Sequence, residues 1–94
     1  MGKYALTRMI AENADLHTEP IPGESIVEIY GTNRVLVENH RGISQCTRDE
    51  ITVRMKKGDI MIFGSCLKIA LMSRERVVVC GNISGVLLKK EVTE

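Results

Sequence analysis

The chain carries two different hydrophobic periods, one before residue 18 and another after residue 25. In the first segment, from residue 5 to about residue 16, the positions that would share one face recur at spacings of three and four. These positions are Leu6, Met9, Ile10, Asn13 and His17. Such spacing predicts an amphipathic helix. A helix of about three turns is marginal alone, so it needs a surface to pack on.

A short segment containing proline and glycine follows this helix. Pro20 and Pro22 favour an extended backbone, and Gly23 comes directly after them. The sequence therefore predicts three parts. They are an N-terminal helical arm over residues 1–18, a hinge over residues 19–24, and a β domain over residues 25–94.

In the β domain the hydrophobic period becomes two. Residues 51–56 and 67–72 place aliphatic side chains at every second position, which predicts half-buried strands. Glycine followed by a small polar residue recurs at residues 31–32, 64–65 and 81–82. Such a pair is typical of a two-residue hairpin turn, since glycine adopts the positive φ that this turn needs.

Register counting supports this arrangement. With a turn at residues 64–65, a four-residue loop at residues 56–59 and an odd-length loop around Arg74, three successive connections keep one aliphatic face. The expected pairs are Ile62–Leu67, Ile60–Ile69, Met55–Ile60, Val53–Ile62, Leu71–Val77 and Ile69–Val79.

Loops at residues 31–33 and 38–42 extend the same face into the first half of the β domain. The pairs that they predict are Ile29–Val35, Val27–Val37 and Val37–Ile43. Residues 81–85 allow two interpretations, a turn that aligns Val79 with Val86 or a bulged strand that continues.

Together these elements predict an all-β fold with one N-terminal amphipathic helix. We expect a meander of about seven or eight short antiparallel strands with one aliphatic face. To bury that face, the sheet would close as a small barrel or sandwich or form a rolled stack. The alternative is an α+β fold in which the N-terminal helix covers the sheet.

The opposite face of the predicted sheet is also apolar. Its members form a candidate interaction face: Met61, Phe63, Cys66, Met72, Val78, Cys80 and Leu87. A patch of this kind is unusually large for a monomer. Either the chain's own helix or another protein would cover it.

Composition limits the classes of function. The chain has 94 residues, no Trp and only 3% aromatic residues, so aliphatic side chains must supply the core. Its 13 basic and 12 acidic residues give a net charge of +1, without the electrostatic footprint that nucleic-acid binding requires. The pairs at residues 56–57 and 89–90 are interpreted as solvated lysines that protect strand edges.

The three cysteines, Cys46, Cys66 and Cys80, contain no closely spaced pair. Their odd number favours free thiols in a reducing compartment. A zinc site would need paired ligands, so no metal and no cofactor are expected. The chain also lacks a signal peptide and long apolar runs, which predicts a soluble cytoplasmic protein without direct membrane insertion.

The segment at residues 37–43 concentrates groups capable of chemistry. Its polar part is a candidate partner-binding loop made of Glu38, Asn39, His40, Arg41 and Gly42. Asn39 and Gly42 suit a turn, and Glu38 could pair with Arg41 or Arg34, but a plain turn does not need His40. A second hypothesis is a small-ligand or nucleic-acid binding module that uses Arg34, His40 and Arg41.

Hydrolysis by His40 with Ser44 and Asp49 is not supported by sequence proximity. A catalytic triad is defined by its geometry in space, and no nucleophile motif surrounds Ser44. We therefore expect no catalytic residues.

The same segment resembles a known family. Residues 37–43 are similar to the "ENHKGI" signature of the YabP/YqfC sporulation proteins, with Arg41 where lysine is usual. Residues 58–69 are similar to the family pattern "G-x-I-x-I-x-G-x-x-L-x-I", and residues 79–83 to its closing "I-x-G-x-I". The resemblance covers about residues 19–89 and is nearest the YqfC branch.

This resemblance implies a non-enzymatic role in the mother cell of a sporulating bacterium. It also implies a partner in the companion membrane protein of the YqfD type. Combined with the second apolar face, it predicts an assembly module that binds this partner or forms a homo-oligomer.

Overall fold

The computed structural model describes residues 23–91. The predicted helical arm and most of the predicted hinge lie outside the described residues. The described part is all-β, as the period of two predicts.

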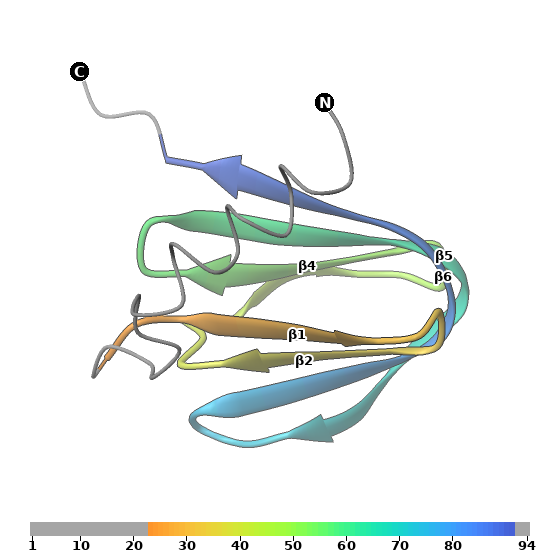
Figure 1. Cartoon of the computed structure of the whole chain (residues 1–94), viewed down its shortest axis with the longest axis horizontal. Coiled ribbons are helices and arrows are strands. Elements are labelled where there is room, and N and C mark those ends of the chain that lie inside the picture. Colours follow the sequence, from red (N-terminus) through yellow and green to blue (C-terminus); the bar gives the residue numbers. More distant parts are fainter. Residues whose placement is uncertain (1–22, 92–94) are drawn as a thin grey trace, which may run out of the picture.

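Six strands form one antiparallel sheet in this part of the chain (Figure 1). They are β1 (Ile26–Tyr30), β2 (Arg34–Glu38), β3 (Ile43–Cys46), β4 (Glu50–Met55), β5 (Gly58–Met72) and β6 (Arg76–Lys90). Their order across the sheet is β1-β2-β6-β5-β4-β3. The prediction of about seven or eight short strands is therefore wrong, because two strands are long. Of the predicted forms (a small barrel, a sandwich or a rolled stack), the barrel is wrong, because the sheet stays open.

The two central strands, each of 15 residues, belong to both halves of a bent sheet. The first part of β5 pairs with β4 and with the end of β6, whereas the last part of β5 pairs with the start of β6, which lies beside β2. We call these the β4 half and the β2 half. Figure 1 shows the bend at the right, where β5 and β6 curve together.

The bend brings the aliphatic faces of the two halves against each other. The buried core consists of Val35, Val37, Val77 and Val79 from the β2 half, Ile51, Val53, Ile60 and Ile62 from the β4 half, and Leu67 near the bend. The sheet thus buries its own inner face. The core positions on β5 and β6 all belong to the face that the predicted register shares, although Leu71, predicted on the same face, is not among them.

The connections on this face differ from the prediction at residues 64–65. No hairpin turn occurs there, and the expected pairs of Ile62 with Leu67 and of Ile60 with Ile69 are wrong, because β5 continues through this point. Gly64 serves a different purpose, since a Cβ on it would overlap the carbonyl oxygen of Asn82 on β6. A glycine in a strand can mark such a close approach as well as a turn.

Residues 81–85 follow the second of the two interpretations, a bulged strand that continues. Gly81 has a φ of 142°, and a Cβ on it would lie 2.7 Å from the carbonyl oxygen of Cys66. The register of β5 against β6 shifts at three places around the bend. Bulges of this kind bend a strand and increase its twist.

The bend also frees backbone amides from the ladder, and neighbouring turns accept their hydrogen bonds. These bonds run from Gly64 to Asp49 (3.1 Å), from Leu67 to Arg48 (2.9 Å), from Gly81 to Asn33 (3.2 Å) and from Ile83 to Thr32 (2.8 Å). Both the β3–β4 turn and the β1–β2 turn are therefore attached to the bend. This satisfies donors that burial would otherwise leave unpaired.

Several other predicted pairs are confirmed. They are Ile29–Val35, Val27–Val37 and Ile69–Val79. The β4–β5 connection has two residues rather than four, so Val53 lies opposite Ile60. This changes the partners but keeps the parity, and both side chains stay in the core.

Two predicted pairs fail for identifiable reasons. Leu71 lies opposite Val78 rather than Val77, because a register shift between Ile69 and Leu71 turns the end of β5 over. Val37 does not pair with Ile43, since β3 lies at the far edge of the sheet. The segment between them crosses from one half of the sheet to the other.

We predict that Gly64→Ala destabilises the protein by about 2 kcal/mol or more, because the methyl group meets rigid backbone rather than a flexible side chain. Gly85→Ala is the matched control on β6, since a Cβ there meets nothing within 4 Å. Its stability should change by less than about 0.5 kcal/mol. Urea unfolding followed by circular dichroism measures both. Equal effects would contradict a bend that depends on close approach at Gly64.

Candidate functional site

The polar segment Glu38, Asn39, His40, Arg41 and Gly42 connects the end of β2 with the start of β3. Because these strands lie in different halves of the sheet, the segment passes along the end of the molecule opposite the bend (Figure 1). It is a crossover, and the predicted hairpin loop is wrong here. Its side chains and amides contact three other segments.

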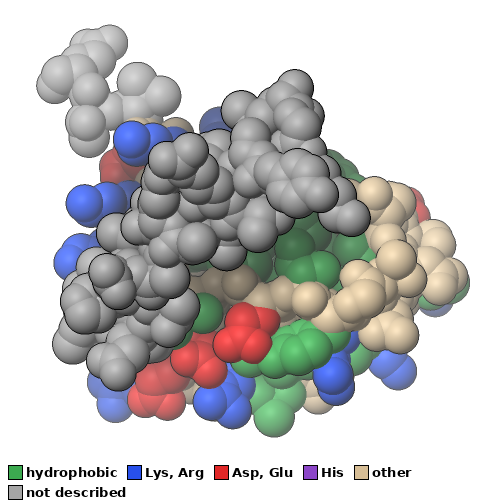
Figure 2. Space-filling model, viewed as in Figure 1, with side chains coloured by type: hydrophobic (Ala, Val, Ile, Leu, Met, Phe, Trp, Pro, Cys, Tyr) green, Lys and Arg blue, Asp and Glu red, His purple; other side chains and the backbone are tan. Residues whose placement is uncertain are grey.

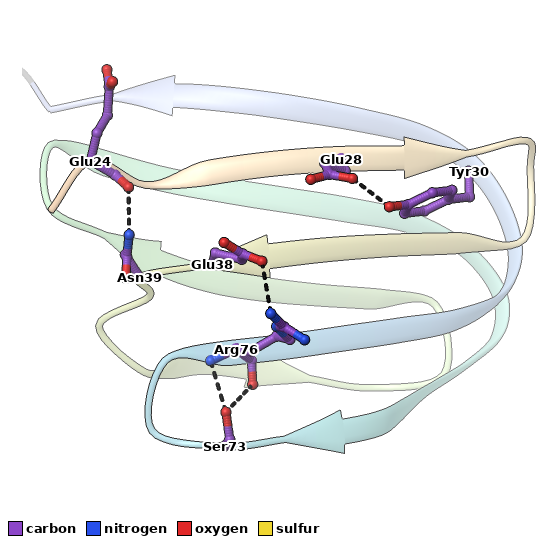
Figure 3. A network of polar contacts seen from close by, with 7 residues as sticks. All are labelled: Glu24, Glu28, Tyr30, Glu38, Asn39, Ser73 and Arg76. Atoms are coloured by element: carbon purple, nitrogen blue, oxygen red, sulfur yellow. Dashed lines mark hydrogen bonds and ion pairs between the residues drawn. The ribbon is translucent and has the colours of Figure 1, made fainter. Parts of the chain in front are cut away.

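Asn39 fixes the start of the crossover. It has a φ of 59°, a conformation that asparagine tolerates better than most residues. Its Nδ2 donates to the carbonyl of Glu24 at 2.7 Å (Figure 3), and its own carbonyl accepts the hydroxyl of Ser25 at 3.1 Å. Its amide donates to the carbonyl of Glu75 at 2.6 Å. Asn39 thus joins the entry to β1 with the β5–β6 turn.

His40 connects the crossover to the β5–β6 turn through its ring. The amide of Gly42 donates to Nδ1 at 3.0 Å, and Nε2 lies 2.8 Å from the carbonyl oxygen of Ser73. Because a backbone amide can only donate, Nδ1 accepts. The N–H of Nε2 then donates to the carbonyl oxygen of Ser73. Both ring nitrogens are therefore engaged by main chain. This network answers why the segment contains a histidine.

The two arginines next to this network contribute differently. Arg76 donates to the carboxylate of Glu38 at 3.1 Å, from the position directly opposite on β6 (Figure 3). Arg34 and Arg41, the partners considered from the sequence, do not take this role. The Arg76 and Glu38 side chains are 55% and 28% exposed, so solvent weakens the pair. Among the contacts of residues 23–91, the amide of Arg41 donates to the carbonyl of Arg54 at 2.7 Å, and Arg41 is an exposed residue.

Arg34 lies at the other end of β2, beside the bend. Its guanidinium stacks on the ring of Tyr30, 4.6 Å from the ring centre. The hydroxyl of Tyr30 donates to the carboxylate of Glu28, and this hydrogen bond raises the pKa of Tyr30 (Figure 3). The structure therefore does not bring Arg34 together with His40 and Arg41, as the second hypothesis would require.

The seven residues of the candidate interaction face remain partly or largely exposed, but they do not form one surface. Met61 lies opposite Leu87, next to Phe63, on the outer side of the β4 half. Val78 and Cys80 lie on the outer side of the β2 half. Cys66 is at the bend with a φ of 54°, and Met72 lies opposite core residue Val77 at the end of β5. The bend separates the two groups.

The three cysteines are free thiols, as predicted. Cys46 and Cys66 are exposed, and Cys80 is half-buried on β6. Between residues 23 and 91, no three side chains of His, Cys, Asp or Glu lie close enough together to hold a metal ion. The same residues contain no helix of the length and hydrophobicity needed to span a membrane.

Comparison with known families agrees with the signature at residues 37–43. The model of the YabP family matches residues 22–94, most of the chain. The chain belongs to the YabP family. Searches of curated proteins and of solved structures find no match. Membership in the YabP family suggests a sporulation-related protein.

The outward position of Leu71 in this YabP-family chain was not predicted. The spacing of two predicts Leu71 on the core face, yet it points outward beside Val78 and is 48% exposed. A register shift at Ala70 causes this. No signal in the sequence marks the shift, since Ala70 is compatible with a regular strand.

The partner-binding role of the crossover stays a prediction, although the network accounts for Asn39, His40 and Gly42.

We predict that His40→Ala destabilises the YabP-family domain by about 1–3 kcal/mol, because it removes an acceptor from the amide of Gly42 and a donor from the carbonyl of Ser73. Arg41→Ala is the control, since the contacts of Arg41 described above use its main chain. It should change stability by less than about 0.5 kcal/mol. Urea unfolding gives both values, and hydrogen exchange at the Gly42 amide should accelerate only in His40→Ala. Equal stability of the two variants would count against this network.

Proposed function

We propose that this YabP-family chain is a non-enzymatic protein of sporulation that acts by binding other proteins. It would serve as an assembly module, either with a second copy of itself or with a membrane-associated partner. The observation that carries this proposal is an apolar patch on the end of β5. We call it the edge patch; it consists of Leu36, Leu71 and Val78.

The edge patch combines a row of side chains with a strand edge. Val78 lies opposite Leu36 on one side and Leu71 on the other, which places the three on the outer face of the β2 half. Leu71 is 48% exposed. Within the described residues, the last part of β5 pairs with β6 alone, so its other edge is open. An exposed apolar strand edge is a template for pairing with another chain.

The second apolar group, Met61, Phe63 and Leu87, lies on the outer side of the β4 half. It adjoins lysines at the end of β6. Beside the edge patch, Glu38 and Arg76 neutralise each other, and Glu28 lies at the margin of the patch, opposite Leu36. A protein interface excludes charge from its centre, which favours the edge patch.

The resemblance described above supports the finer part of the proposal. It is nearest to the YqfC branch, and it suggests a companion membrane protein of the YqfD type as the partner. The protein would then act in the cytoplasm of the mother cell, held at a membrane through that partner. No cofactor enters this function.

The oligomeric state of the purified chain tests the proposal. We expect light scattering to give a mass above that of one chain, and Leu71→Lys to restore a monomer because it places a charge in the edge patch. Leu87→Lys is the control; it changes an equally exposed leucine on the other half and should leave the assembly intact. Circular dichroism confirms that both variants keep the β-sheet.

Two results would contradict the proposal. One is a monomeric chain that also fails to bind the soluble part of the companion membrane protein. The other is an assembly that Leu71→Lys leaves intact and Leu87→Lys dissociates, since the interface would then lie on the β4 half.

A further inference from the structure

Six exposed cations that are widely separated in the sequence meet at one end of the β4 half. We call this the basic end; it consists of Arg41, Arg54, Lys56, Lys57, Lys89 and Lys90. The pairing of β4, β5 and β6 causes this. Arg54 lies opposite Asp59, which lies opposite Lys89, and Lys90 lies opposite Gly58 next to the β4–β5 turn. The crossover also reaches this end, because the amide of Arg41 donates to the carbonyl of Arg54.

The basic end is more strongly positive than the chain as a whole. Six cations less the carboxylates of Glu24, Asp59 and Glu91 leave +3 at this end, whereas the whole chain carries +1. The remaining residues therefore carry −2. In Figure 2, Lys and Arg side chains gather along the left side of the view, where Figure 1 places the β4–β5 turn and the end of β6. Segregated charge of this kind attracts an anionic partner.

The surface at the basic end is open and continues into an apolar one. Arg41, Arg54, Lys56 and Lys89 line a shallow hollow of about 560 Å³. Met55 and Lys56 also line a neighbouring hollow of about 530 Å³, together with Val27 and Leu88. Leu88 is 65% exposed, lines this hollow beside Lys56 and Lys57, and shares a face of β6 with Lys90. An exposed leucine thus stands beside cations on this side of the sheet.

This combination identifies the class of partner. Single-stranded nucleic acid is bound by cations interleaved with aromatic side chains, and neither hollow is lined by an aromatic residue. A small anion would need a more enclosed site than a shallow hollow. A bilayer surface offers anionic headgroups for the cations and, below them, an apolar layer that accepts leucine.

We propose that the basic end is a docking surface for an anionic phospholipid bilayer. Lys56, Lys57, Lys89 and Lys90 would contact the headgroups, and Leu88 would enter the boundary between headgroups and acyl chains. Each cation contributes a small part of the affinity, so binding needs several of them together. This docking does not rest on the edge patch, which lies on the other half of the sheet.

Sedimentation of the full chain with vesicles tests this proposal. We expect binding to vesicles of phosphatidylcholine with about one third phosphatidylserine, and none to phosphatidylcholine alone. High salt should weaken it, because the cations are exposed. The double variant Lys56→Gln/Lys89→Gln should lower the affinity about fivefold for each cation removed. The control Lys68→Gln/Arg74→Gln removes two exposed cations elsewhere and should bind as the native chain does.

Three outcomes would overturn the proposal. One is equal binding to anionic and neutral vesicles, or to neither. Another is an equal loss in the two double variants, because the basic end would then have no special role. The last is binding to a single-stranded oligonucleotide or to polyglutamate that matches binding to the vesicles at the same salt, which would assign a different polyanion.

Discussion

The close approach of β5 and β6 at the bend is the constraint on which the rest of this structure depends. Gly64 and Gly81 each face a carbonyl of the other strand, where a Cβ would collide. Without side chains at these points, both strands can bend together and fold one sheet over its own inner face. The two halves then bury eight fully enclosed Val and Ile side chains, each worth about 1.5–3 kcal/mol. The open sheet thus has a core without closing into a barrel.

The bend also determines at which end of the molecule the polar crossover lies. At the bend, the β1–β2 and β3–β4 turns give their carbonyls to amides of β5 and β6, so their main chain is committed. The opposite end holds the crossover, which must span both halves because β2 and β3 lie far apart in the sheet. Asn39 and His40 tie this crossover to the entry of β1 and to the β5–β6 turn. In the family signature, at least Asn39 and His40 therefore have a structural role.

The sequence predicts the inner face of this sheet better than its connections. Period-two spacing assigns Ile60, Ile62, Val77 and Val79 to one face, and all four are buried. The path between them was not predictable, because glycine followed by serine suits both a turn and a close approach of two strands. The segment around His40 is conspicuous in the sequence, but its partner Ser73 is 33 residues away. The basic end was missed for the same reason, since only strand pairing brings its parts together.

The crossover network also fixes the two proposed surfaces relative to each other. The edge patch belongs to the β2 half and the basic end to the β4 half, and the shared core packs these halves against each other. At the end opposite the bend, His40 bonds to Ser73 in the β5–β6 turn, while the amide of Arg41 bonds to β4. Through these contacts, one short segment is bonded to both halves of the sheet. A chain that assembles through the edge patch would thus present every basic end at a defined angle, so that weak single contacts with a bilayer act together.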